Sequence, residues 1–280
     1  MTFITRFAPS PTGPLHLGHA YSAMLAHDMA TAAGGTFLLR IDDLDKSRAR
    51  AQWEEQIYDD LAWLGLTWET PVRRQSDHFA DYDKVLQKLS KLGLTYACTC
   101  TRRDIETAAN APQEGVPEFG PDGRIYPGTC CNARHALSKA KCIRLNMRAA
   151  CEHAMPASFE EGGPDQHGKH ALDVETMVST IGDVVLARPN MAASYHLSVV
   201  VDDAATGVTD VVRGADLFGA TSIHVVLQKL LGLRTPHYHH HKLIRDDTGK
   251  RLAKRDDARA ISKYRADGAS PADIRAMAGL

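Results

Sequence analysis

The spacing of apolar positions in the first third of the chain predicts alternating strands and helices. Residues 2–7 and 36–41 have the pattern of short buried strands, and between them residues 17–33 repeat apolar positions at helical spacing. Helical patterns follow over residues 47–64 and 76–92, each with a glycine just beyond its end. This order is typical of a parallel sheet covered by helices.

The pattern changes between residues 96 and 168, where glycine, proline and cysteine become frequent. We interpret this stretch as a subdomain inserted into the α/β unit. Beyond it the sequence predicts strands at 183–186, 195–201, 208–212 and 238–244, a helix at 221–231, and a helical tail. The predicted fold class is therefore α/β, a parallel sheet divided by an insertion and followed by a helical C-terminal segment.

Composition narrows the functional classes. The 280 residues carry a formal net charge of −1, which argues against bulk attraction to nucleic acid. A local basic stretch exists, however: residues 242–265 hold nine Lys/Arg and four Asp, a net of +5. The start has no signal-peptide pattern, and no apolar run approaches a membrane span. We expect a cytoplasmic protein without membrane attachment, whose six cysteines stay reduced.

The most informative run, from Arg6 to His19, reads RFAPSPTGPLHLGH. Its three prolines and two glycines predict a tight turn leading into a helix that starts near two histidines spaced i, i+3. A helix start presents unpaired backbone N–H groups, which suit phosphate. Residues 163–170 imitate a P-loop but lack its Ser/Thr, so we predict a surface connection there.

His16-Leu17-Gly18-His19 matches the HIGH signature of class I aminoacyl-tRNA synthetases, and the residues before it resemble those of the glutamyl enzymes. Residues 251–255 (RLAKR) resemble the KMSKS loop of the same class, with Arg251 and Ala253 departing from the usual Lys and Ser. The resemblance extends from residue 6 to 255. It implies a Rossmann-like catalytic half at 1–95, an acceptor-type insertion at 96–168, a second half at 169–236, and the KMSKS-like loop with a helical tail at 237–280.

The resemblance also implies roles for individual residues. The implied catalytic residues are His16, His19 and Lys254, and those for ATP with Mg²⁺ are Pro9, Thr12, Gly18, His240, Arg251 and Lys254. The implied glutamate-binding residues are Arg6, Ala8, Ser10, Asp42, Tyr195 and Arg213. Arginine suits a carboxylate because its fork donates two parallel hydrogen bonds. Asp42 stands where the family usually has Glu, and would meet the substrate ammonium.

The cysteines of the insertion are spaced for a metal site. Cys98 and Cys100, followed by Cys130 and Cys131, supply thiolates of the kind that zinc binds, although C-x-C is less usual than C-x₂-C. The alternative is a group of reduced, packed cysteines. Synthetases of the glutamyl-Q type show C-x-C and then Tyr-x₃-Cys, which implies one structural Zn²⁺ on Cys98, Cys100, Tyr126 and Cys130, with Cys131 a competitor for one place.

A catalytic core without an anticodon-binding domain resembles the glutamyl-Q tRNA(Asp) synthetases. That resemblance implies activation of L-glutamate with ATP in the absence of tRNA, followed by transfer to the queuosine base of the tRNA(Asp) anticodon arm, by a monomer. One alternative is a short glutamyl-tRNA synthetase that charges a tRNA 3′ end. Another, of a different class, is a catalytically silent, zinc-containing RNA-binding paralogue.

Overall fold

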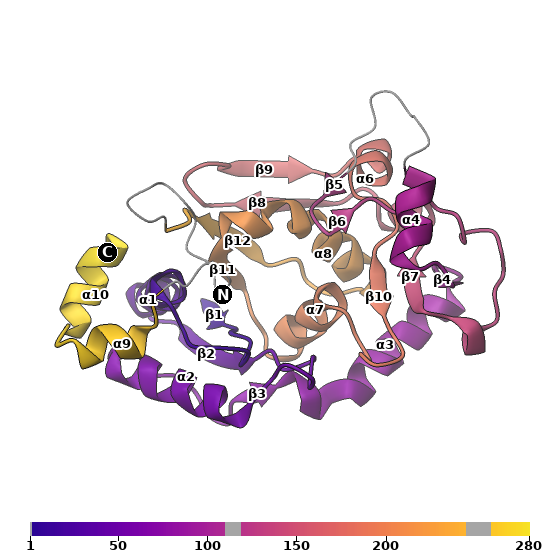
Figure 1. Cartoon of the computed structure of the whole chain (residues 1–280). Coiled ribbons are helices and arrows are strands. Elements are labelled where there is room, and N and C mark those ends of the chain that lie inside the picture. Colours follow the sequence, from indigo (N-terminus) through magenta and orange to yellow (C-terminus); the bar gives the residue numbers. More distant parts are fainter. Residues whose placement is uncertain (1, 110–118, 245–258) are drawn as a thin grey trace.

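The computed structural model describes residues 2–109, 119–244 and 259–280 (Figure 1). The strands are β1 (Ile4–Phe7), β2 (Thr36–Ile41), β3 (Arg73–Arg74), β4 (Thr95–Cys98), β5 (Phe119–Gly120), β6 (Gly123–Arg124), β7 (Cys142–Leu145), β8 (Ser158–Glu161), β9 (Gly168–Ala171), β10 (Val185–Ala187), β11 (Asp210–Gly214) and β12 (His237–His241). The helices are α1 (Leu17–Ala32), α2 (Ala51–Trp63), α3 (Phe79–Lys91), α4 (Arg102–Ala109), α5 (Met147–Ala154), α6 (Val174–Thr180), α7 (Tyr195–Ala205), α8 (Phe218–Leu231), α9 (Ile261–Ala266) and α10 (Pro271–Ala278).

Parallel strands form the centre of the molecule, which confirms the predicted fold class. β1 pairs parallel with β2 and β2 with β3, while β11 pairs parallel with β12 and β12 with β8. The two groups meet where the backbone N–H of Thr209 donates to the carbonyl of Ile4 at 2.9 Å. The carboxyl ends of β1, β2, β11 and β12 consequently share one edge, where ligands bind in open α/β sheets.

Residues 195–201 form the first part of helix α7, so the strand predicted there is wrong. A short apolar run does not by itself distinguish a buried strand from a buried helix. Ser194 decides the outcome locally, because its hydroxyl accepts the backbone N–H of Leu197 and caps the helix start. Both Leu197 and Val200 are then buried, and the two carboxylates that follow, Asp202 and Asp203, stand on a helix.

The insertion has a sheet of its own. β7 pairs antiparallel with both β4 and β10, whereas β8 and β9 belong to the sheet that contains β11 and β12. The predicted boundary at residue 168 does not coincide with the division between the sheets. β8, which lies before this boundary, belongs with β9 to the sheet of β11 and β12, whereas β10, which lies after it, pairs with β7 of the insertion. Residues 164–167 are an exposed connection between β8 and β9, as the sequence predicts.

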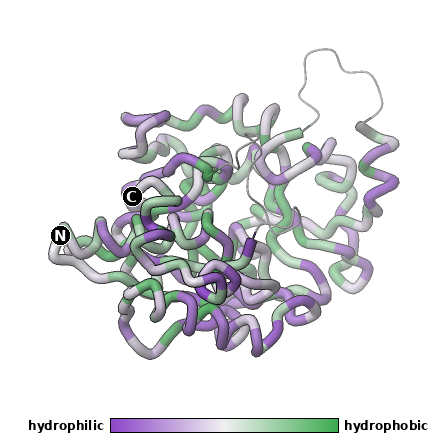
Figure 2. Tube along the Cα trace, turned by 60° about the vertical axis from the view of Figure 1, so that its left-hand side comes forward, coloured by the Kyte–Doolittle hydropathy of each residue, from purple (hydrophilic) through white to green (hydrophobic). Residues whose placement is uncertain are grey.

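Two large clusters of buried apolar side chains form most of the core. One lies between β1, β2, α1, α2 and α10, and the other between α3, α5, α7 and α8. Figure 2 shows hydrophilic stretches gathered towards the periphery. Among the described helices, none is both long enough and apolar enough to cross a lipid bilayer.

Asp60 of α2 is a buried carboxylate, and the charge of Arg265 offsets its burial only in part. It is fully shielded from solvent, and within the described ranges neither of its oxygens has a hydrogen-bond partner. Burial, with a further contribution from the charge of Asp59, raises the pKa of Asp60 to about 6. The folded state thus favours the protonated form, so its stability contribution is present below pH 4 and is lost as the pH rises through 6.

We predict that Asp60→Asn flattens this pH dependence. With the pKa raised from about 4 to about 6, the unfolding free energy of the variant minus that of the native protein should rise by about 2 kcal/mol between pH 4 and pH 8. Urea unfolding at both pH values measures it. Parallel pH profiles for the two proteins would contradict the assignment.

Candidate active site

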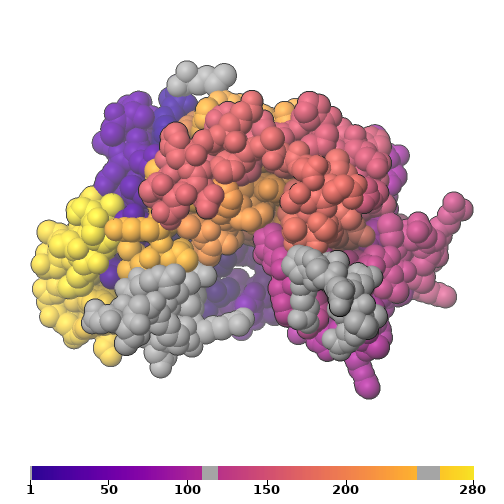
Figure 3. Space-filling view, turned by 90° about the horizontal axis from the view of Figure 1, so that it is seen from above, coloured from indigo at the N-terminus to yellow at the C-terminus, as the bar shows by residue number. Residues whose placement is uncertain are grey.

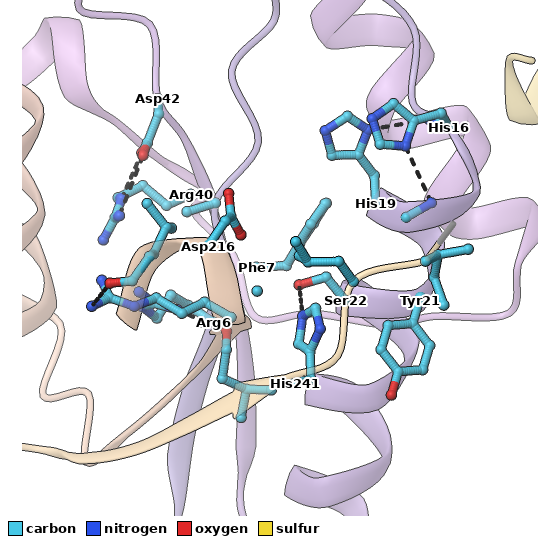
Figure 4. Close-up of a pocket in the computed structure, with 18 of the residues that line it drawn as sticks. Arg6, Phe7, His16, His19, Tyr21, Ser22, Arg40, Asp42, Asp216 and His241 are labelled. Carbon is cyan, nitrogen blue, oxygen red and sulfur yellow. Dashed lines mark hydrogen bonds and ion pairs between the residues drawn. The ribbon is translucent and has the colours of Figure 1, made fainter. Parts of the chain in front are cut away.

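A cavity of about 350 Å³ lies at the carboxyl ends of the central strands and the N-terminus of α1. Figure 3 shows a hollow in the surface between the light-orange region that contains β12 and the magenta region of the insertion. Figure 4 shows the residues around the cavity. Of the predicted residues, those lining it are Arg6, Ala8, His16, Gly18, His19, Asp42, Tyr195 and Arg213. Pro9, Ser10, Thr12 and His240 do not line it, and Arg251 and Lys254 lie outside the described residues.

His16 and His19 form a stacked pair at the start of α1. Their ring centroids lie 3.7 Å apart, and each Nδ1 accepts a backbone N–H: that of Gly18 at His16, and that of His16 at His19, both at 3.1 Å. An imidazole whose Nδ1 accepts is neutral and carries its proton on Nε2. The capping arrangement therefore fixes both tautomers, leaving Nε2–H as the donor of each ring.

A buried network of arginines and carboxylates forms the opposite wall. Asp203 accepts hydrogen bonds from Arg6 Nε at 3.0 Å and from Arg40 Nη1 at 2.5 Å, and Arg40 Nε donates to Asp42 at 2.7 Å. Burial raises the pKa of Asp203, but Arg6 and Arg40 outweigh it and hold the pKa below its usual range. For Asp42 the balance is the opposite: burial outweighs the charge of Arg40, and the pKa of Asp42 is raised above its usual value. This wall thus places Arg6, which can bind an anion, beside Asp42, which can bind a cation.

Arg213 enters the cavity from β11 with its guanidinium held on three sides. Nε donates to His240 at 3.0 Å and Nη1 donates to His224 at 3.1 Å. Nη2 donates to Thr221 at 2.7 Å and to the carbonyl of Leu217 at 3.3 Å. The guanidinium group of Arg213 is therefore fixed in one orientation, and most of its N–H groups already donate to protein atoms.

The histidines of β12 divide between the two faces of the strand, as alternation predicts, but their roles differ from the expectation. His240, predicted near ATP, is buried between Arg213 and Glu161 and does not reach the cavity. His241 does line it: its Nε2 accepts from the Ser22 hydroxyl at 3.0 Å, and its ring meets Tyr21 edge-on. Burial lowers the pKa of His241, so the ring is neutral at pH 7.

The cysteines of the insertion converge. The Sγ atoms of Cys98, Cys100 and Cys130 lie within 4.8 Å of one another, and the Tyr126 hydroxyl lies 3.4 Å from the first two. A tetrahedral zinc site with Zn–S bonds of about 2.3 Å separates its sulfurs by about 3.8 Å, so the group fits zinc. Cys131 is not part of this converging group, and its Sγ accepts from Asn146 Nδ2 at 3.3 Å.

Residues 2–279 match the family of tRNA synthetases class I (E and Q), catalytic domain. The chain belongs to this family. Its members are aminoacyl-tRNA synthetases, so the chain is a ligase of this class.

Relatives narrow the branch of the synthetase family. The chain is 63% identical to a glutamyl-Q tRNA(Asp) synthetase of Rhodobacter capsulatus, over 99% of this chain and 100% of that protein. A glutamyl-Q tRNA(Asp) synthetase of Nitratidesulfovibrio vulgaris is 41% identical, over 96% and 83%. A glutamate tRNA ligase structure from Elizabethkingia meningosepticum superposes with a TM-score of 0.76 at 25% identity, and this chain spans 61% of its length. The recognition made from the sequence is confirmed.

The sequence alone missed several residues of this synthetase site. Arg40 and Asp203 hold Arg6 and Asp42 in place, and His241 with Ser22 lines the cavity. Two signals were available: Arg40 is near the end of the strand predicted at 36–41, two residues before Asp42, and strand alternation separates His241 from His240. Asp203 had no signal, because its place depends on α7 being a helix.

We predict that Cys100→Ser lowers the zinc content of the purified protein, because it removes one thiolate from the converging group. Elemental analysis of protein refolded or expressed with zinc measures it. Cys131→Ser is the matched control, since Cys131 bonds Asn146 outside the group, and its zinc content should equal that of the native chain. Full zinc in Cys100→Ser would remove Cys100 from the ligand set.

Proposed function

We propose that this synthetase activates L-glutamate with ATP without needing tRNA, and transfers the glutamyl group to the queuosine base in the anticodon of tRNA(Asp). The observation that carries the proposal is one cavity that combines Arg6, Arg213 and Asp42 with the paired imidazoles of His16 and His19. The names of the two curated relatives support the choice of acceptor. The cavity volume of about 350 Å³ is within the range of small-molecule sites.

Glutamate has two carboxylates, which need hydrogen-bond donors, and one ammonium group, which needs an acceptor. The guanidinium groups of Arg6 and Arg213 line the cavity and supply donors for carboxylates, while Asp42 supplies an acceptor for the ammonium. Ala8, next to this wall, and Tyr195, whose ring packs edge-on against His224 and His196, complete the predicted subsite. Ser10 stays a prediction, as it does not line the cavity.

ATP would lie towards the start of α1. The backbone N–H groups of a helix N-terminus and two Nε2–H donors suit the phosphates. The basic segment that contains Arg251 and Lys254 starts just after Ile244, which lines the cavity, and the chain after it returns at Ala260, which bridges to His16. The described residues Ile244 and Ala260, on either side of residues 245–258, thus lie at the cavity and at His16, which supports the assignment of Arg251 and Lys254 to ATP–Mg²⁺. Pro9, Thr12, Gly18 and His240 stay predictions for this subsite.

The remaining assignments follow from the proposed reaction. Zn²⁺ on Cys98, Cys100, Tyr126 and Cys130 would stabilise the insertion. The net charge of +5 that residues 242–265 carry suits the phosphates of an RNA arm. We further propose a monomer acting in the cytoplasm, where tRNA and ATP are available.

Transfer of labelled glutamate to tRNA(Asp) tests the proposed acceptor. We expect tRNA(Asp) that contains queuosine to accept label and tRNA(Asp) that lacks queuosine to accept none. After nuclease cleavage the label should lie in the anticodon fragment. Label in the 3′ fragment would favour a short glutamyl-tRNA synthetase, and RNA binding without any transfer would favour the silent paralogue.

We predict that His19→Asn cuts the rate of glutamyl-adenylate formation by about 100-fold or more, the usual cost of losing a donor to developing phosphate charge. Asn keeps an acceptor near the position of Nδ1 and so preserves the cap on His16, but removes the Nε2–H donor. Lys254→Ala should lower the same rate by removing a phosphate-binding charge.

Pyrophosphate exchange measures the rate, and thermal unfolding checks the fold. An exchange rate within twofold of the native protein for either variant would contradict that residue's role in activation.

A further inference from the structure

Arg213 is the centre of a chain of side chains that runs to the surface of the insertion. His224 Nδ1 lies 3.1 Å from Arg213 Nη1, His224 Nε2 lies 3.1 Å from His196 Nδ1, and His196 Nε2 lies 3.0 Å from Asp122 Oδ1. Both histidines are buried, with exposed fractions of 5% and 2% for His196 and His224. The side chain of Asp122 is 42% exposed, so the chain of contacts ends at solvent.

The hydrogen bonds in this chain have one direction. A guanidinium only donates, so His224 accepts at Nδ1 and must carry its proton on Nε2. That proton is donated to His196 Nδ1, which leaves the His196 proton on Nε2, facing the Asp122 carboxylate. Burial, followed by the charge of Arg213, lowers the pKa of His224 well below its ordinary value, which agrees with a neutral ring.

A second arm holds the guanidinium from the other side. Arg213 Nε donates to His240 Nε2, whose Nδ1 then donates to Glu161. Glu161 also accepts the backbone N–H of His240 at 2.8 Å and of Gly163 at 2.6 Å. This arm is anchored inside the central sheet, on β8 and β12, and so it is fixed by the fold itself. The arm to Asp122 is anchored in the insertion.

Asp122 lies in the turn between β5 and β6 (the hairpin, residues 119–124), which Figure 1 shows between α6 and α8. The hairpin is closely packed on both helices. A Cβ on Gly219 of α8 would lie 3.1 Å from the Pro121 side chain, and a Cβ on Gly120 would lie 2.3 Å from the carbonyl of Thr180 at the end of α6. Contacts this close, made by glycine, fix where the turn places Asp122.

We propose that Asp122 is a positioning residue for the amino-acid subsite, acting through His196 and His224 on the guanidinium of Arg213. The placement of the insertion on the catalytic half thereby sets the affinity for the substrate carboxylate that Arg213 meets. The inference rests on the proposed function for the substrate, but the hydrogen-bond relay itself does not.

Asp122→Ala tests the proposal. Because Asp122 is a half-exposed turn residue, the variant is expected to fold. We expect the KM for glutamate in ATP–pyrophosphate exchange to rise about threefold to tenfold, the cost of one weakened hydrogen bond, with kcat and the KM for ATP within twofold. Asp122→Asn, which keeps an acceptor oxygen and suits the turn, should recover most of the effect.

Two controls separate the relay from general damage. Asp104→Ala removes another carboxylate of the insertion, one that accepts the backbone N–H of Thr101, and should leave the KM for glutamate unchanged. In a His196→Phe background the relay is already cut, so Asp122→Ala should add no further rise. A further rise in that background, or an unchanged KM in Asp122→Ala alone, would overturn the proposal.

The side-chain nitrogen resonances of histidine and arginine report the relay without relying on activity. Asp122→Ala should shift the His196, His224 and Arg213 signals, while Asp104→Ala should shift none of them. Unmoved signals would overturn the relay. A native chain that exchanges no pyrophosphate with glutamate would instead overturn the proposed substrate, and the resonances would still decide whether Asp122 acts on Arg213.

Discussion

Two adjacent carboxylates on α7 join the parts of the molecule that form the site. Asp203 accepts from Arg6 of β1 and Arg40 of β2, and Asp202 accepts from Arg73 of β3 at 2.8 Å, with Gln75 and Tyr82 as further donors. Unpaired, each of these buried charges would cost several kcal/mol, and paired they are compensated only if β1, β2 and α7 lie where they do. The sheet edge and the wall of the cavity that contains Arg6 and Asp42 therefore depend on the same ion pairs.

Arg6 and Arg213, two of the arginines that line the cavity, are held in different ways. Arg6 is oriented by a direct ion pair with Asp203, whereas Arg213 is held through neutral histidines on both sides. A donor fixed before the ligand arrives needs little reorganisation when charge appears, which is how such sites gain their strength. The same logic applies to His16 and His19, whose capping bonds fix the tautomer that has its N–H donor at Nε2. Orientation, more than the number of charges, is what the fold provides.

Sequence reasoning named many of the residues that line the cavity because its signals were local. The turn before His16, the paired histidines and the cysteine spacing could be read within short windows, and the structure brings these residues together. Failures came where a residue's role depends on distant partners. The strand predicted at 195–201 is a helix because Ser194 caps it and both its faces are buried, and Asp203 could not be placed without that helix. His240 is the histidine predicted near ATP, but His241 is the one that lines the cavity, because alternation shows that the two face opposite ways and not which face meets the cavity.

The central claim is that this cavity activates glutamate by itself. Glutamate-dependent ATP–pyrophosphate exchange with no tRNA present, beside aspartate and glutamine, tests it most directly. The arrangement of Arg6, Arg213 and Asp42 predicts exchange with glutamate, and little or none with an acid one methylene shorter or with the neutral amide. Absence of exchange with glutamate, or equal exchange with all three, would contradict the account.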